Sequence, residues 1–273
     1  MDGGYDQEDV TELARVLTGW SISGLRGEGD IGFVFRREFH DVRPKEVIGY
    51  TFGSGGGIEE GEKMIRVLAH HPSTAKHIAT KLCQRFVSDD PPQALIDRVA
   101  KRFLQTGGDL RETLRAVLTS SEFFDPTYYR AKTKTPLEYV ASAIRAVDGT
   151  TDGRSVSKMI ADMGQPLYLC QPPTGYSEVA EDWISSGALL ARINFSIALA
   201  ANRVSGTKVG LEPESADPEL VDKLSVALVG GDLSDETRAT IVSRLESEEV
   251  VPKDKNATLV AGLILGSPEF QRQ

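Results

Sequence analysis

The chain has few of the residues that build covalent staples or metal sites. Its 273 residues include two cysteines, Cys83 and Cys170, and four histidines. Two thiols cannot form the disulfide network that holds small secreted domains together. No HExxH motif, CxxC pair or GxSxG motif is present, so no spacing typical of a metal or serine-nucleophile site appears. The sequence therefore predicts no cofactor and no metal, and we interpret Cys83 as a buried, unreactive thiol.

A surplus of basic residues and a long apolar run are also missing. Lys and Arg total 31 against 40 Asp and Glu, for a net charge of -9. Such a charge repels nucleic acid and anionic membranes unless a basic patch is segregated, and none is visible. No run reaches the roughly 18 apolar residues that a membrane span needs. We therefore expect no nucleic-acid partner and no membrane insertion.

Helical periodicity is what the chain does have, along most of its length. Apolar residues recur at spacings of three and four after N-cap signals such as Asp6, Asp109 and Thr135. A further helix is expected after Pro92, and the others are predicted over 7–20, 58–70, 72–87, 110–120, 135–147, 155–163, 186–202, 218–229, 235–247 and 256–265.

Two runs near the start of the chain are the only convincing strands. Residues 31–39 and 47–52 are rich in aromatic and β-branched side chains and flank a turn at 41–44, so we predict one β-hairpin over about 31–52. The small, polar stretch 205–215 is the best candidate linker. The predicted fold is mainly α: an irregular multi-helix bundle with this hairpin over 1–204, then a small C-terminal helical subdomain over 205–273.

Two histidines and an aspartate are the candidate catalytic residues. His40 and Asp41 end a predicted strand, and His71 ends a predicted helix. If the two loops meet, these side chains would suit a metal site or an acid/base pair. An imidazolium at a helix C-terminus also complements the helix dipole without any chemistry. We favour this structural interpretation of the histidines.

The predicted hairpin turn contains more than a turn requires. A turn needs only Asp, Pro or Gly chemistry, yet His40 and Lys45 stand there as well. We expect the hairpin to pack its Phe33 and Phe35 side on the body. We also expect His40 to lie partly buried against the helix that begins at Pro72, its ring held by a carboxylate or a backbone carbonyl.

Three prolines interrupt the apolar segment 164–176, GQPLYLCQPPTGY, so it cannot be a continuous helix. We predict an ordered loop that packs on the body. An exposed apolar patch here would mark a protein interface. The candidate partner-binding residues are Tyr168, Leu169, Tyr176 and Trp183.

The order of several phrases resembles a known family. The runs YDQEDVTELARVLTGW, FHDVRPKEVIGYTFGSGGG, HHPSTAKHIATKLCQRFVSDDPP, GGDLRETLRAVLTSSEF, KTPLEYVASAIRA and GQPLYLCQPPTGY follow one another between residues 5 and about 200. They resemble the bacterial domain-of-unknown-function family eighteen hundred. The polar or aromatic positions that match its pattern are Arg15, Trp20, His40, Asp41, Lys45, His71, Lys81, Gln165, Trp183 and Arg192.

The resemblance implies a cellular context but no reaction. Members of this family are usually longer, often with a secretion signal upstream, so the chain resembles their C-terminal portion and a periplasmic or secreted location is implied. Their genes often neighbour a second uncharacterised family related to sulfatases, which implies an exported protein partner. No catalytic role is established for the matching positions.

Two hypotheses of function follow. The leading one is a non-enzymatic, exported bacterial binding or assembly module that acts with a protein partner, because no catalytic spacing is recognisable. The alternative is a hydrolase, possibly metal-assisted, in which His40 and His71 act as ligands or as acid and base and Asp41 orients one of them. The sequence does not decide whether the protein is an enzyme.

Overall fold

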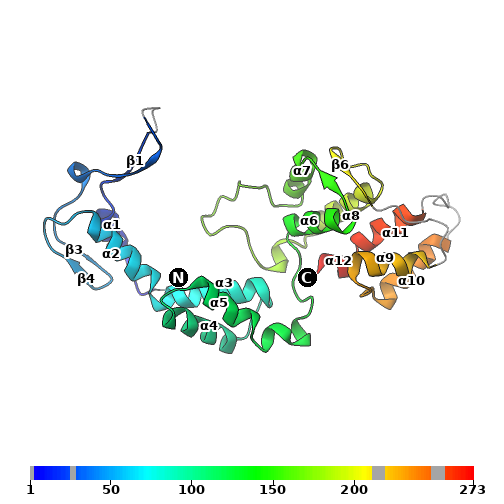
Figure 1. The fold of residues 1–273 in the computed structure, drawn as a ribbon, viewed down its shortest axis with the longest axis horizontal. Helices are drawn as coiled ribbons and strands as arrows, with labels where there is room; N and C mark the ends of the chain where they lie inside the picture. The colour runs from blue at the N-terminus through cyan, green and yellow to red at the C-terminus, as the bar shows by residue number, and fades with distance from the viewer. Residues whose placement is uncertain (1–2, 25–28, 211–218, 247–255) are drawn as a thin grey trace. The chain divides into compact units, whose positions relative to one another are not determined.

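The chain folds into two compact units. A computed structural model describes residues 3–24, 29–210, 219–246 and 256–273. The first unit comprises residues 1–86 and 91–123, and the second comprises 87–90 and 124–273 (Figure 1). Helices dominate both units and the described strands are two to four residues long, so the mainly α prediction is confirmed. No helix of the described residues is long and apolar enough to span a bilayer.

The first unit begins with a helix and two small hairpins and continues with four helices. Its elements are α1 (Gln7–Val16), β1 (Trp20–Ser23), β2 (Gly32–Phe35), the 3-10 turn η1 (Arg37–Phe39), β3 (Lys45–Val47), β4 (Tyr50–Phe52), α2 (Ile58–Ala69), α3 (Pro72–Phe86), α4 (Gln93–Gln105), α5 (Leu110–Leu118) and the 3-10 turn η2 (Glu122–Phe124), which reaches the unit boundary.

The strands pair differently from the predicted hairpin. β2 pairs with β1, and β3 pairs with β4, so the two predicted runs lie in two separate hairpins. The first helix ends at Val16 rather than at Trp20. Gly19 has a φ of +83°, which lets the chain leave the helix and lets the Gly19 carbonyl accept a hydrogen bond from Arg36. Trp20 can then lie opposite Phe35, which the helical interpretation of this segment excluded.

Small apolar clusters hold the first unit together. Val16 of α1, Val47 of β3, Phe52 of β4 and Met64 of α2 form one of them. In α3, α4 and α5 the buried side chains recur at helical spacing and include the predicted inert thiol of Cys83. Burial raises the pKa of that thiol to about 11, so it is protonated at neutral pH.

The second unit contains the remaining helices. Its elements are the 3-10 turn η3 (Pro126–Tyr128), α6 (Pro136–Ala146), β5 (Thr150–Thr151), α7 (Arg154–Asp162), the 3-10 turn η4 (Ala180–Asp182), α8 (Ser186–Ala200), β6 (Thr207–Lys208), α9 (Leu220–Val229), α10 (Asp235–Glu246), α11 (Asn256–Leu265) and α12 (Pro268–Gln271).

One apolar core joins the helices of this unit. Tyr139 of α6, Phe195 of α8, Leu224 of α9 and Ile264 of α11 are all buried in it. The predicted boundary near residue 205 does not coincide with the observed division, because the helices on both sides of it share this core. The predicted linker itself falls partly on 211–218, outside the described residues.

Candidate functional site

The predicted residues Arg15 and Asp41 meet where α1 and the segment after η1 come together. Asp41 accepts hydrogen bonds from Arg15 Nε at 2.9 Å and from Arg43 Nη2 at 2.6 Å. The two guanidinium groups hold the pKa of the Asp41 carboxyl well below its usual range. Arg15 also donates to Glu12 and to the Pro44 carbonyl. Asp41 is therefore an ionised structural acid, and both of its carboxylate oxygens accept hydrogen bonds from arginine residues.

Immediately beside this corner lies a buried ionic cluster of three side chains, His40, Lys45 and Glu60. Lys45 Nζ donates to Glu60 Oε2 at 2.7 Å, and His40 Nε2 lies 3.3 Å from the same oxygen. The side chains of His40 and Lys45 have no exposed surface, and that of Glu60 is 5% exposed. His40 is buried and its ring contacts a backbone carbonyl, that of Thr18, as expected from the sequence. The predicted packing of His40 against the helix that begins at Pro72 is wrong. Glu60 belongs to α2, not to the helix that begins at Pro72.

Geometry fixes where the hydrogen of the His40 ring lies. Nδ1 is 2.9 Å from the Thr18 carbonyl oxygen, which can only accept, so Nδ1 carries a hydrogen. Nε2 lies 3.3 Å from Glu60 Oε2 but has no hydrogen-bond partner within the described residues. The ring of His40 has no exposed surface from which to reach a substrate.

Aromatic rings cover this corner. Phe35 lies edge-on to His40 with ring centroids 5.4 Å apart, whereas Phe33 is 57% exposed and contacts Trp20 at 5.1 Å. The indole of Trp20 packs on Gly61 of α2, where an added Cβ would lie 2.5 Å from the ring. Only a glycine at this position of α2 leaves room for the tryptophan.

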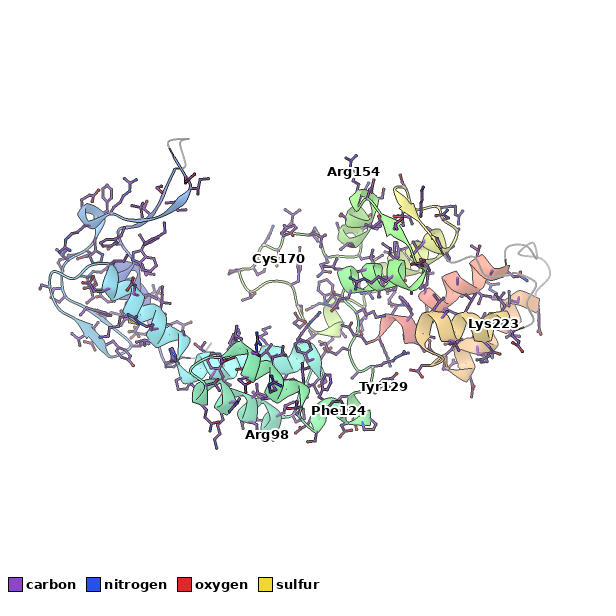
Figure 2. All side chains as sticks on the ribbon, in the orientation of Figure 1. Arg98, Phe124, Tyr129, Arg154, Cys170 and Lys223 are labelled. Atoms are coloured by element: carbon purple, nitrogen blue, oxygen red, sulfur yellow. The ribbon has the colours of Figure 1, made fainter. Side chains whose placement is uncertain are left out.

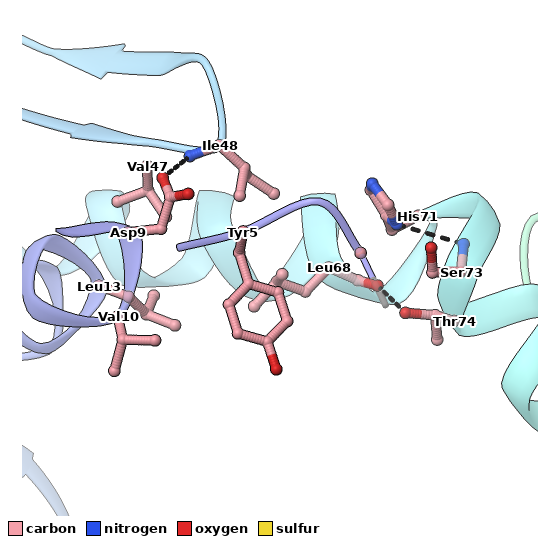
Figure 3. Close-up of a pocket in the computed structure, with 11 residues that line it drawn as sticks. Tyr5, Asp9, Val10, Leu13, Val47, Ile48, Leu68, His71, Ser73 and Thr74 are labelled. Carbon is pink, nitrogen blue, oxygen red and sulfur yellow. Dashed lines mark hydrogen bonds between the residues drawn. The ribbon is translucent and has the colours of Figure 1, made fainter. Parts of the chain in front are cut away.

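His71 lies elsewhere in the first unit. It lines a pocket of about 290 Å³ at the junction of α2 and α3, together with Tyr5, Val10 and Leu68 (Figure 3). Its Nδ1 accepts a hydrogen bond of 3.2 Å from the backbone N–H of Ser73. Neither His40 nor Asp41 lines this pocket.

The three candidate catalytic residues therefore occupy different surroundings. Asp41 is bound by arginines, His40 by Thr18 and Glu60, and His71 by the start of α3. Within the described ranges, no group of three His, Cys, Asp or Glu side chains is placed to hold a metal ion. This arrangement gives no support to a hydrolase that needs His40 and His71 at one centre.

The candidate partner-binding residues divide into two exposed and two that hold the loop. Tyr168 is fully exposed and Leu169 is 70% exposed, on the loop 164–183 between α7 and α8 that also contains Cys170 (Figure 2). Tyr176 and Trp183 lie beneath, with ring centroids 6.1 Å apart. The hydroxyl of Tyr176 donates to the Pro166 carbonyl, and Trp183 Nε1 donates to the Ser177 carbonyl at 3.1 Å.

Polar residues fix both ends of the 164–183 loop. At the start, Gln165 is buried and its Oε1 accepts the backbone N–H of Leu137 at 2.8 Å. At the end, Asp89 accepts the backbone N–H of Ala180 at 2.7 Å, and Lys132 Nζ donates to the Glu178 carbonyl at 3.0 Å. The predicted ordered loop is thus present, tied to its own unit at each end.

The two remaining residues of the family pattern, Arg192 and Lys81, belong neither to the ionic cluster, nor to the His71 pocket, nor to the 164–183 loop. Arg192 is fully buried in the second unit, where its guanidinium donates to the Lys134 carbonyl at 2.8 Å and lies over the ring of Tyr139. Lys81 is an exposed residue of α3. Arg192 is a core residue that ties α8 to the start of α6.

Sequence reasoning missed Glu60 and Thr18. Glu60 stands among the acids at the start of the helix predicted over 58–70, and no motif surrounds it. It shares the buried face of α2 with Met64, four residues later, and an acid at that spacing on an apolar face is the signal for a buried ion pair. No comparable signal marks Thr18, because its role comes from the left-handed turn after it.

These features define a mainly helical protein of two units, with a buried ionic cluster in the first and an anchored, exposed loop in the second. The chain belongs to the family described as "Protein of unknown function (DUF1800)", which matches residues 1–272. No curated protein and no solved structure matches the chain.

Proposed function

We propose that this protein is a non-enzymatic binding or assembly module that engages a protein partner through the 164–183 loop. One observation carries the proposal: Tyr168 and Leu169 project into solvent from a loop whose two ends and base are tied down. Large exposed apolar side chains are common at protein interfaces. Tyrosine in particular supplies contact area at a small cost in conformational entropy.

The backbone at Tyr168 adds weight to this proposal. Its φ is +61°, in the left-handed region, which costs a residue with a Cβ about 1–2 kcal/mol. A side chain that gains nothing from burial does not repay that cost within this chain. Contact with a partner would repay it, because strain of this kind is concentrated at functional sites.

The nature of the partner follows from charge and from the family resemblance. A net charge of -9 disfavours a nucleic acid. Export to the periplasm or the outside of the cell is part of the proposal, and so is a partner from the sulfatase-related family whose genes lie beside those of this family. Both parts rest on the resemblance and are tested with the partner.

Co-expression is the direct experiment. The full chain is produced with the product of a neighbouring gene of that second family, and the two are expected to co-purify at moderate salt. Tyr168→Asp and Leu169→Asp should each weaken the complex, whereas Val226→Asp, at another exposed apolar position of the second unit, should not. Failure of the wild-type pair to co-purify, or equal loss in the control, contradicts the proposal.

A further inference from the structure

A second surface of the protein, in the first unit, combines an apolar pocket with an acidic groove. The pocket, of about 290 Å³, is lined mainly by Tyr5, Val10, Leu13, Ile48 and Leu68 (Figure 3). Tyr5 and Val10 are about half exposed although both are apolar. The cavity is at the lower end of the range for small-molecule sites, and its size suits a single large side chain.

The acidic groove adjoins the pocket. It has a volume of about 600 Å³, and Asp9 lines both cavities. Five carboxylates line the groove: Asp6, Glu8, Asp9, Glu12 and Glu46.

The two cations that line the groove, Arg15 and Lys45, leave most of its carboxylates without an ion-pair partner in the described part of the chain. Arg15 is shared by Glu12 and Asp41, and Lys45 is bound to Glu60. Among the residues that the structure describes, Glu8 and Glu46 have no ion-pair partner. The groove therefore presents uncompensated negative charge beside an apolar hole.

The polar groups of the pocket are mostly committed. Asp9 accepts the backbone N–H groups of Ile48 and Asp6, and the hydroxyl of Thr74 donates to the Leu68 carbonyl. Because Nδ1 of His71 accepts a hydrogen bond, the neutral ring carries its hydrogen on Nε2. Within the described ranges that N–H has no partner, so one donor remains beside the apolar lining.

From this pairing we infer a peptide-docking site: the pocket takes one large apolar side chain of a partner segment, and the acidic groove takes Lys or Arg residues next to it. Apolar burial supplies most of the affinity and charge complementarity supplies the orientation. A carbonyl of the bound segment is a suitable acceptor for His71 Nε2. This site lies in the first unit and does not depend on the 164–183 loop, so the two proposals fail separately.

The experiment uses the full chain and three synthetic peptides: acetyl-KKWKK-amide, acetyl-KKAKK-amide and acetyl-EEWEE-amide, titrated with detection by NMR or fluorescence. We expect the first to bind with a Kd of the order of 0.1–1 mM, and each of the others at least about fivefold more weakly. Equal binding of the alanine peptide, equal binding of the acidic peptide, or no binding of the first peptide at about 5 mM overturns the inference.

Matched variants locate the site. Val10→Ser removes an exposed part of the pocket lining, and Glu8→Gln with Glu46→Gln removes the unpaired charges. Each should weaken binding of acetyl-KKWKK-amide about threefold or more, with the charge variant also losing most of its salt dependence. The control is Glu59→Gln with Glu62→Gln on exposed positions of α2 outside the groove. Equal loss in the control, or none in the Val10→Ser and charge variants, overturns the assignment.

Discussion

Lys45 and Glu60 are joined by a 2.7 Å hydrogen bond between Nζ and Oε2, with both side chains removed from solvent. The pair connects β3 to the first turn of α2. Removing one partner of such a pair leaves a buried charge with too few contacts. Lys45→Met should therefore lower the free energy of unfolding by about 3–5 kcal/mol.

Urea unfolding checks this value, with Lys76→Met on the exposed face of α3 as the control. Lys45→Met combined with Glu60→Leu should recover part of the loss, because the carboxylate that Lys45→Met leaves without its ammonium partner is then removed as well. A double variant that is as unstable as the sum of its single variants contradicts the account.

His40 should matter for stability independently of any activity. His40→Ala removes the donor to the Thr18 carbonyl and the buried ring that lies 3.3 Å from Glu60. We expect a loss of about 1–3 kcal/mol, measured by thermal or urea unfolding. His70→Ala, which removes only the exposed contact of Nδ1 with the Arg66 carbonyl at the end of α2, should cost less, below about 1 kcal/mol. Equal melting of the His40→Ala variant and the wild type would show that this corner is not structural.

Lys134 should make the stability of the protein depend on pH. Burial, with Arg130 and Arg192 nearby, lowers the pKa of its ammonium to about 8. Because the unfolded chain keeps that proton to higher pH than the native chain, stability should rise as the pH increases from about 8 towards the ordinary lysine value. Relative to Lys134→Met, the wild type should gain about 1–2 kcal/mol over this interval, allowing for partial exposure.

Unfolding free energies of the two proteins at pH 7, 8, 9 and about 10 supply the test. Their difference is the quantity of interest, since ionisation of tyrosine and cysteine affects both proteins alike. A difference that is constant over the interval, or that moves in the opposite direction, contradicts the assignment.

The left-handed backbone at Tyr168 should make tyrosine at this position no better for stability than glycine, although tyrosine is needed for the proposed binding. Tyr168→Gly removes the left-handed strain, but glycine also gives the unfolded chain more freedom. The net effect should be between no change and a gain of about 1 kcal/mol in unfolding free energy. Gly164→Ala, at a φ of +103° on the same loop, should instead lose stability. A Tyr168→Gly variant that is less stable than the wild type by more than about 1 kcal/mol would falsify the strained, unpacked description.

Local signals in the sequence predicted the helices well. Asp6, Asp109 and Thr135 each cap the helix that follows, as their spacing indicates. Capping depends on residues three positions apart, so it can be read without knowledge of the fold. The strand pairing could not be read in this way, because it depends on Gly19 turning the chain so that Trp20 lies opposite Phe35.

The candidate sites were predictable only in part. The segment 164–176 is recognisable as an ordered loop from its prolines, but which of its aromatic residues face solvent depends on tertiary packing: Tyr176 is half-buried while Tyr168 is fully exposed. His40, Asp41 and His71 have the side-chain chemistry of a catalytic site, but the fold does not bring the three side chains together. His40 and Asp41 contact residues distant in sequence, Glu60 and Arg15, which the hairpins bring near, whereas the ring of His71 accepts a hydrogen bond from the nearby Ser73.

The most direct test of the proposed function is the affinity of the purified protein for the product of the neighbouring gene, measured by calorimetry. The account predicts a 1:1 complex whose Kd rises at least about tenfold, or roughly 1.4 kcal/mol, for Tyr168→Asp. The Val226→Asp control should keep the wild-type Kd. No heat of binding for the wild-type pair, or an unchanged Kd for Tyr168→Asp, would contradict the claim that the 164–183 loop is a partner-binding surface.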